Sequence, residues 1–153
     1  QILRENILGA DRFDYAFKTY IEKWAYKHPT PWDFFKTMDN AAGEDLSWFW
    51  RGWFMENYKL DQAITDVKYD KENPANGAIV TLQNADQMAL PVLLSWQTAS
   101  GAAGSQVLPV EIWNNTDQFK VKIDTKEKLK WVKIDAGKRF PDINTANNSW
   151  QAE

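Results

Sequence analysis

The chain has a single histidine, His28, and no cysteine, which limits the metal and nucleophile chemistry open to it. A catalytic zinc ion usually takes three protein ligands, mostly imidazole and carboxylate groups. The HExxH helix that supplies two of them needs two histidines one turn apart. Serine or cysteine catalysis needs an oriented histidine too, and the sequence contains no GxSxG elbow. Because His28 precedes Pro29 between two expected helices, we predict a capping or surface role for it.

Carboxylates occur in pairs of the kind that glycosidases use as acid and base, or that bind calcium in loops. The pairs are Glu44 with Asp45, Asp66 with Asp70, and Asp124 with Asp135. A chain with 21 acidic residues among 153 forms such pairs by chance. No EF-hand pattern accompanies them, so we interpret them as solvated faces. We therefore predict no catalytic, cofactor-binding or metal-binding residue in this chain.

Nine tryptophans are the most unusual feature of the composition. In the segment 47–54, aromatic residues fall on one helical face, and we interpret this stripe as core rather than as a ligand platform. Trp96, Trp113 and Trp131 are predicted to lie in strands. An exposed row of them could stack on sugar rings. The alternation of Trp96 with Met88 and Leu90 instead points it inward.

The first sixty residues have the periodicity of α-helices. We predict a first helix that ends at Gly9 in a C-cap position. Asp11 and Asp14 are the predicted N-cap pair of a second helix. Its apolar stripe consists of Phe13, Ala16, Phe17, Tyr20, Ile21 and Trp24.

A third helix is predicted from the segment Thr30-Pro31-Trp32-Asp33, where a cap, a proline and an acid follow the capping-box pattern. We expect this helix to stop near Gly43. A fourth helix would present Leu46, Phe49, Trp50, Trp53 and Phe54.

From about Gln62 the apolar period changes to two, which is typical of half-buried strands. The segments 73–77 and 114–117 are predicted turns, and 99–105 a loop. Strand candidates are 79–82, 88–96, 107–113, 119–123 and 129–134. Pro91 and Pro109 cannot donate to a ladder, so we expect them near strand edges or bulges. Several short strands at this spacing predict an antiparallel β-sandwich.

The predicted fold class is therefore α+β, with an N-terminal helical segment packed on an antiparallel β-sandwich. No Gly/Pro/Ser-rich linker marks the boundary near residues 60–66, so we expect the halves to pack together. The formal net charge of −3 gives no general attraction to nucleic acid. No stretch approaches the roughly 20 apolar residues of a membrane span.

Several motifs occur in an order that resembles a known family. They are Phe13-Asp14-Tyr15-Ala16-Phe17-Lys18-Thr19-Tyr20-Ile21, Trp32-Asp33-Phe34-Phe35, Gly43-Glu44-Asp45-Leu46 with the aromatic helix after it, Leu108-Pro109-Val110-Glu111-Ile112-Trp113 and Phe140-Pro141-Asp142-Ile143-Asn144. Together they are similar to the end of the catalytic domain, and the β-sandwich that follows it, in the aminopeptidase N family of zinc metallopeptidases (gluzincins). The individual motifs are loose, but their order and spacing are fairly specific.

The resemblance implies that residues 1–61 are the helical tail of a thermolysin-like catalytic domain, and that residues 62–153 are an immunoglobulin-like β-sandwich domain. The HExxH motif, the distal glutamate ligand, the amine-binding motif and the catalytic tyrosine of the family match nothing here. We therefore expect a non-catalytic C-terminal fragment that supports the absent catalytic domain. Zinc and peptide substrate are expected only in the intact parent, and the missing N-terminal and catalytic domains are the expected partners.

Two alternatives remain open. One is a binding module, in which the sandwich presents aromatic residues to a carbohydrate or peptide and the helices are an appendage. The other is a stand-alone adaptor that descends from the peptidase and has lost the active site. The sequence does not fix the location of the protein, although the bacterial periplasm or cell exterior is favoured for a parent of this family.

Overall fold

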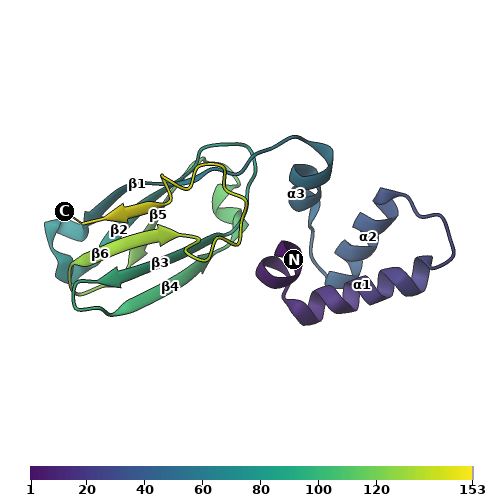
Figure 1. The fold of residues 1–153 in the computed structure, drawn as a ribbon, viewed down its shortest axis with the longest axis horizontal. Coiled ribbons are helices and arrows are strands. Elements are labelled where there is room, and N and C mark those ends of the chain that lie inside the picture. Colours follow the sequence, from purple (N-terminus) through teal and green to yellow (C-terminus); the bar gives the residue numbers. More distant parts are fainter. Residues whose placement is uncertain (153) are drawn as a thin grey trace. The chain divides into compact units, whose positions relative to one another are not determined.

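The structure is a computed structural model that describes residues 1–152, and it divides the chain into two compact units (Figure 1). Residues Gln1–Asn57 form a helical unit, and Tyr58–Glu153 form a unit of two antiparallel sheets. The predicted α+β class is confirmed. The assignment of 1–61 and 62–153 to two peptidase domains stays a prediction. Among the described residues, no helix combines the length and apolarity needed to cross a bilayer.

The helical unit contains three α-helices and two short π-helical turns. In chain order these are η1 (Leu3–Ile7), α1 (Ala10–Trp24), α2 (Pro31–Ala42), α3 (Ser47–Trp50) and η2 (Arg51–Met55). The stripe predicted for the second helix does lie on α1. The predicted fourth helix corresponds to α3 and η2, so its winding widens at Arg51 rather than continuing as one regular α-helix.

The predicted N-cap pair of α1 is wrong. The helix begins at Ala10, one residue before Asp11, and its N-cap is Gly9, which makes no side-chain cap. Gly9 has φ 82° and ψ 156°, a conformation that glycine reaches without steric cost and that lets the chain turn directly from η1 into α1. Asp14 instead accepts two 2.7 Å hydrogen bonds from the Arg4 guanidinium, which lower the pKa of its carboxyl group.

The capping box predicted at the start of α2 is confirmed. The Thr30 hydroxyl accepts a hydrogen bond from the Asp33 backbone N–H, and the Asp33 carboxylate accepts one of 2.8 Å from the Thr30 N–H. Hydrogen bonds from the Thr30 backbone and hydroxyl groups lower the pKa of Asp33. The helix ends at Gly43, whose φ of 67° gives the left-handed C-cap that its position in the sequence predicts.

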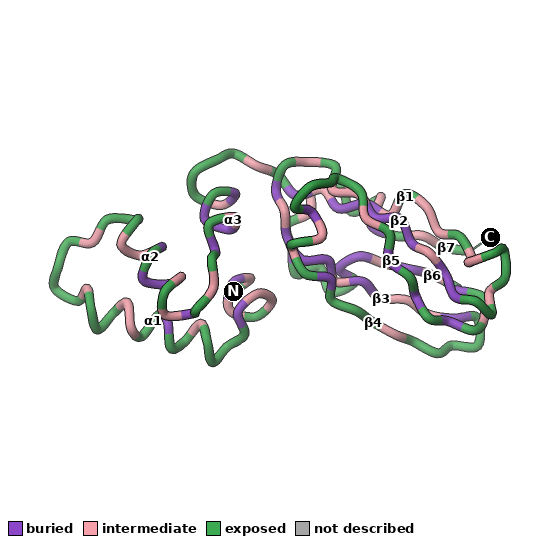
Figure 2. Tube along the Cα trace, turned by 180° about the vertical axis from the view of Figure 1, so that it is seen from behind, coloured by how far each residue is buried: buried purple, intermediate pink, exposed green. Residues whose placement is uncertain are grey.

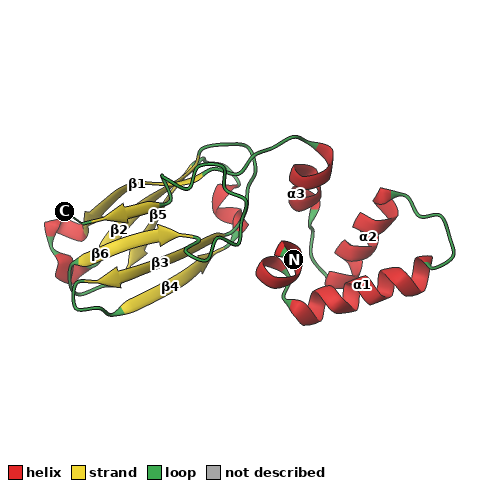
Figure 3. Ribbon diagram, viewed as in Figure 1, coloured by secondary structure: helices red, strands yellow, loops and turns green. Residues whose placement is uncertain are grey.

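The second unit is a sandwich of seven strands in two sheets (Figure 3). The first sheet has the order β1-β2-β5 and the second the order β4-β3-β6-β7, with every pairing antiparallel. The strands are β1 (Gln62–Tyr69), β2 (Ala78–Asn84), β3 (Val92–Thr98), β4 (Ala103–Leu108), β5 (Gln118–Ile123), β6 (Leu129–Ile134) and β7 (Ser149–Gln151). Pro91 and Pro109 lie immediately before β3 and after β4, as expected.

A single aliphatic core lies between the two sheets. Its fully buried members come from both of them and include Ala78, Val80, Leu82, Val92, Leu94, Ile123, Leu129 and Val132. Burial of one such Val, Leu or Ile side chain is worth about 1.5–3 kcal/mol relative to leaving it exposed. Residues two apart on one strand reach the same core, which explains why the alternation in the sequence predicts these strands.

The predicted strand 107–113 is wrong beyond Leu108. Strand β4 ends there, Pro109 follows, and Val110–Trp113 form a 3-10 turn. Proline has no N–H with which to continue the ladder, so the apolar run after it packs as a turn instead. The loop predicted at 99–105 is also too long, because Ala103 to Ser105 pair with β3. Small residues fit here since an indole ring, that of Trp96, lies directly opposite Gly104.

A buried amide anchors the start of β1. The Gln62 side chain is 1% exposed, and its Nε2 donates to the Leu90 carbonyl at 3.0 Å. The same carbonyl accepts a 3.0 Å hydrogen bond from the Trp113 indole N–H. The carbonyl of Leu90, itself fully buried, is thus satisfied by two side chains from distant parts of the chain.

Candidate functional site

The residues that could do chemistry are dispersed rather than gathered. His28 is exposed in the connection between α1 and α2. Across residues 1–152, no cluster of three or more His, Cys, Asp or Glu side chains has the spacing to hold a metal ion. The single histidine and the available carboxylates therefore do not fit a zinc site within the described part of the chain.

The carboxylate pairs considered in the sequence serve separate structural contacts. Glu44 forms an ion pair with Arg12 at 2.8 Å, whereas Asp45 caps the backbone N–H of Ser47 at 2.9 Å. Asp70 forms a 2.9 Å ion pair with Lys122 on β5, and this contact lowers the pKa of its carboxyl group. Asp66 forms its own 2.9 Å ion pair with Lys68, so each of these carboxylates has a separate partner.

Asp124 and Asp135 differ in burial. Asp124 is exposed, whereas Asp135 is 7% exposed at the turn after β6. Asp135 Oδ2 accepts a 2.7 Å hydrogen bond from the Phe140 N–H, and its backbone carbonyl accepts one from the Lys138 N–H. Its other carboxylate oxygen is buried without a partner among the described residues. The main role of this carboxylate is thus to fix the turn 135–140.

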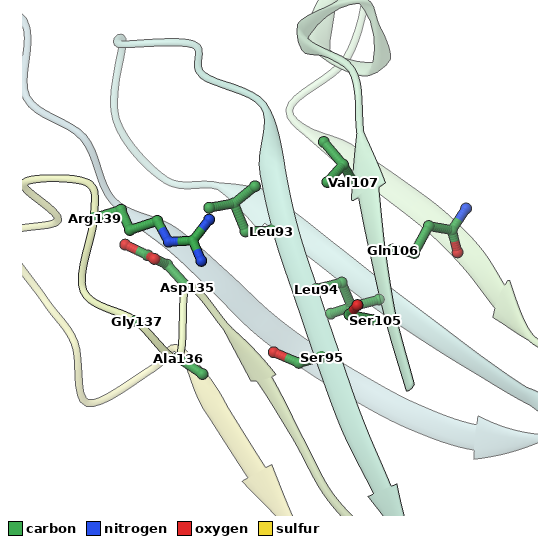
Figure 4. A pocket seen from close by; sticks show the side chains of 10 residues that line it. All are labelled: Leu93, Leu94, Ser95, Ser105, Gln106, Val107, Asp135, Ala136, Gly137 and Arg139. Atoms are coloured by element: carbon green, nitrogen blue, oxygen red, sulfur yellow. The ribbon is translucent and has the colours of Figure 1, made fainter. Parts of the chain in front are cut away.

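A shallow pocket of about 200 Å³ lies between this turn and the outer face of β3 and β4 (Figure 4). Its sheet side presents two hydroxyls beside apolar groups, from Ser95, Ser105, Leu93 and Val107. Arg139 extends over Asp135 on the opposite side. The Asp135 carboxylate in this pocket accepts its hydrogen bond from the Phe140 N–H rather than from either serine hydroxyl.

The three tryptophans considered as a sugar platform do not form one exposed row. Trp113 lies in the 3-10 turn rather than in a strand, and it is 8% exposed. Trp96 packs against the sandwich core, as its alternation predicts. Trp131 lies on the outer face, where its indole N–H donates to the Gln97 side chain at 3.0 Å. Lys133 lies 5.2 Å from the Trp131 ring centroid.

The most distinctive feature of the helical unit is a chain of contacting aromatic rings, here called the aromatic array. Its members are Phe13, Phe17, Tyr20, Trp32, Phe34, Phe35, Trp48, Phe49, Trp50, Trp53 and Phe54. Ring centroids of successive pairs lie 4.8–6.4 Å apart, the range of favourable stacked and edge-to-face pairs. The array joins all three helices.

The centre of the aromatic array is buried. Trp50 is 2% exposed, stacks on Phe35 with a centroid distance of 4.8 Å, and donates its indole N–H to Asp39 at 2.7 Å. Burial raises the pKa of Asp39, and the indole hydrogen bond partly opposes this. Phe49 is buried beside Trp50. The interpretation of the segment 47–54 as core is confirmed for Phe49 and Trp50, and it is wrong for Phe54, which is 64% exposed.

The rim of the aromatic array is exposed. Trp32 and Phe54 both contact Phe35, and they are 58% and 64% exposed. On α1, Phe17 and Ile21 are 43% and 48% exposed although they lie one turn apart on one face. Among the described residues, seven of the nine large exposed apolar side chains belong to the helical unit. We define its candidate docking surface as Trp32 and Phe54, which share Phe35 as a neighbour.

Comparison with known proteins gives likenesses to solved structures alone. No protein-family model matches the chain, and no curated protein does. Among solved structures, the chain is similar to the crystal structure of Legionella pneumophila aminopeptidase A in complex with aspartic acid, with a TM-score of 0.60 and 15% sequence identity. The match covers 83% of this chain and 14% of that chain. A likeness at this identity supports a shared, peptidase-like fold.

Proposed function

We propose that this chain is the C-terminal part of a bacterial zinc aminopeptidase and that it has a structural, non-catalytic role there. The helical unit would be the last part of the catalytic domain, and the sandwich the domain that follows it. The match to the Legionella aminopeptidase supports this proposal. The matched 83% of this chain is longer than either compact unit, so it must include residues of both. The zinc would belong to the part of the parent that precedes this chain.

The observation that carries the proposal is the exposed docking surface of the helical unit. Trp32 and Phe54 each leave more than half of their area in solvent, although both contact the buried centre of the array. Large apolar side chains grouped in this way commonly mark a surface that a protein partner covers. The proposed partner is the remainder of the catalytic domain, whose helices would pack against these rings.

The first experiment tests the catalytic side of the proposal. The purified chain is assayed for bound zinc by elemental analysis and for hydrolysis of amino-acid p-nitroanilides. We expect no stoichiometric zinc and no turnover above the buffer blank. The gene product that includes the upstream sequence is measured in parallel, and we expect zinc and activity from it. Zinc-dependent hydrolysis by the chain alone would refute the proposal.

The second experiment tests the docking surface. Trp32→Ser and Phe54→Ser are combined, once in this chain and once in the longer gene product. We expect the double variant to lower the melting temperature and activity of the longer protein, because it removes buried contacts there. In this chain alone the change in stability should be small. Ile143→Ser, an exposed apolar position in the second unit, is the matched control. Equal effects in the long and short proteins would contradict the docking role.

A further inference from the structure

The sandwich has four strands at sheet edges, and three of them carry features that prevent further pairing. Strand β7 is only three residues long. Strand β1 has a register shift between Ile64 and Asp66 and carries charged side chains. Strand β5 carries Lys120 and Lys122. Such short strands, bulges and lysines are the usual protection of natural edges.

Strand β4 lacks all of these protections. Its sequence, Ala-Gly-Ser-Gln-Val-Leu, contains no charge and no proline, and its pairing with β3 has no register shift. Four of its six residues are exposed, and Figure 2 shows the strand at the margin of the sandwich. The side chain of Val107 is 63% exposed. Strand β4 is therefore an open, uncharged edge.

The pairing of β3 with its two neighbours shows which residues of β4 direct their backbone N–H and C=O groups toward β3. The Leu93 carbonyl accepts from the Asp135 N–H on the β6 side, so Leu93 and every second residue of β3 bond toward β6. The intervening residues of β3 bond toward β4, where they face Gly104, Gln106 and Leu108. The hydrogen bond from Thr98 N to Ala102 O, next along the hairpin, has the same phase.

The backbone groups of the alternate β4 residues consequently point away from the sheet. These residues are Ala103, Ser105 and Val107, and within residues 1–152 their N–H and C=O groups make no hydrogen bond to any other segment. They are evenly spaced about Ser105. An antiparallel copy of the same strand, centred on Ser105, would meet every one of these groups with a matching donor or acceptor.

We infer that β4 pairs antiparallel with β4 of a second copy of this chain, across a two-fold axis at Ser105, so that the two four-stranded sheets become continuous. In this register Ser105 lies opposite the partner's Ser105, and Ala103 lies opposite the partner's Val107. The inference does not rest on the proposed peptidase origin. It uses the isologous symmetry that most homodimers adopt.

The side chains fit this arrangement. Gly104 lies opposite the partner's Gln106, and Ala103 opposite the partner's Val107, so each larger side chain meets a small one. Figure 4 shows Gln106 and Val107 on opposite sides of β4, which places one such contact on each face of the joined sheet. No like charges meet, whereas two copies of β5 would bring lysines together, which is unfavourable.

The expected affinity is low. A contact built mainly from two six-residue strands falls in the small, transient class of interfaces, below about 1,200 Å² in total. We expect weak, reversible dimerisation that grows as the protein concentration is raised, rather than an obligate dimer. A foreign extended peptide would use the same backbone groups, but it would lack the symmetric side-chain fit of a second copy.

The test is sedimentation velocity of the full 153-residue chain over a range of concentrations. Ser105→Pro removes the outward N–H on the axis in both copies while leaving the β3 ladder intact, so it should abolish the dimer. Ser105→Ala, the matched control, should retain it. Phe54→Lys separates this contact from association through the helical unit, and it should also retain the dimer.

A charge swap tests the register. Ser105→Lys and Ser105→Glu each place like charges directly opposite one another, and each should weaken the dimer by about fivefold. An equimolar mixture of the two should recover association to at least the wild-type level, as a heterodimer. Circular dichroism checks that each variant keeps the wild-type fold.

Several results would overturn the inference. The wild-type chain would stay monomeric at millimolar concentration, or its dimer would survive Ser105→Pro. Loss of the dimer in Phe54→Lys, or failure of the mixed Ser105→Lys and Ser105→Glu variants to associate, would have the same meaning. A chain that captures an added peptide of the β4 sequence without self-associating would assign the edge to a foreign strand and would likewise reject the dimer.

Discussion

The two units of this molecule use apolar residues in opposite ways. The sandwich closes an aliphatic core between its sheets, with Val80, Val92 and Val132 wholly buried. The helical unit is held by rings that touch in series, and it leaves Trp32 and Phe54 largely in solvent. The sandwich therefore meets the usual requirement for a self-contained domain. The helical unit keeps large apolar side chains in solvent, a feature that commonly marks an interaction surface.

The largest expected effect comes from the centre of the aromatic array. Trp50→Ala removes the stack on Phe35 and the hydrogen bond to Asp39, and should cost about 3–5 kcal/mol of the free energy of unfolding of the helical unit. The loss is measured as helical signal in far-ultraviolet circular dichroism. Trp32→Ala, at an exposed ring of the same type, is the control. An unchanged helical signal in Trp50→Ala would contradict the importance of the array.

The corresponding core substitution in the sandwich is Leu94→Ala. Leu94 is 1% exposed between the sheets, so we expect a loss of about 2–5 kcal/mol in denaturant unfolding. The neighbouring Leu93 faces the other side of β3, and Leu93→Ala should cost distinctly less. If the helical signal is lost together with the sandwich in Leu94→Ala, the two units do not unfold separately and the contrast between them fails.

Gly104→Ala tests the close approach of an indole ring to β4. An added Cβ would lie 2.5 Å from the nearest ring atom of Trp96, so the ring must move. We expect a cost of about 1–3 kcal/mol and a shift in tryptophan emission. Ser105→Ala on the same strand is the control, with a change within about 0.5 kcal/mol. Equal stability of the two variants would show that the ring has room to spare.

The capping box of α2 is expected to contribute less. Thr30→Ala should cost about 1 kcal/mol, measured by thermal unfolding of the helical signal. The hydrogen bonds from Thr30 lower the pKa of Asp33 in the folded chain. The stabilisation that comes from the ionised Asp33 carboxylate is therefore complete above the unfolded pKa of about 3.9. It is lost as the pH falls through the lower pKa of the folded chain. Asp33→Asn should remove that part of the acid sensitivity, and an unaltered pH profile would contradict the assignment.

The smallest expected effect on stability is at the rim of the array. Phe54→Ser in this chain should change the free energy of unfolding by no more than about 0.5 kcal/mol, because the ring is 64% exposed. It should nevertheless reduce binding of the dye ANS, which reports exposed apolar surface. Ile143→Ser provides the comparison in the second unit. A large loss of stability in Phe54→Ser would make this ring a core residue and erase the contrast.

Local rules in the sequence predict much of this fold. The capping box at Thr30 and the turn at Gly43 act through the nearest few backbone groups, so the residues themselves reveal them. The alternation in 119–123 likewise reports one buried face. The prediction of Asp11 as an N-cap fails because the conformation of Gly9 lets α1 begin at Ala10. Asp11 then lies inside the first turn of the helix.

Features that depend on long-range packing are less predictable. Trp113 has the composition of a strand residue, yet Pro109 ends the ladder and the ring is buried beside Leu90. The stripe on α1 reads as core by its periodicity, although Phe17 and Ile21 are exposed in the chain as it stands. Periodicity identifies an apolar face of a helix, and it does not reveal whether that face is buried in the folded chain. The sequence pattern therefore does not predict that Phe17 and Ile21 are exposed.

The buried amide of Gln62 has a consequence for how the sandwich forms. If β1 slipped by a single position, Ala63 would occupy this place, and the Leu90 carbonyl would lose one of its two donors. Misaligned pairing is thus penalised at the first residue of the first strand. The amide therefore favours the native alignment of β1 over one that is shifted by a residue.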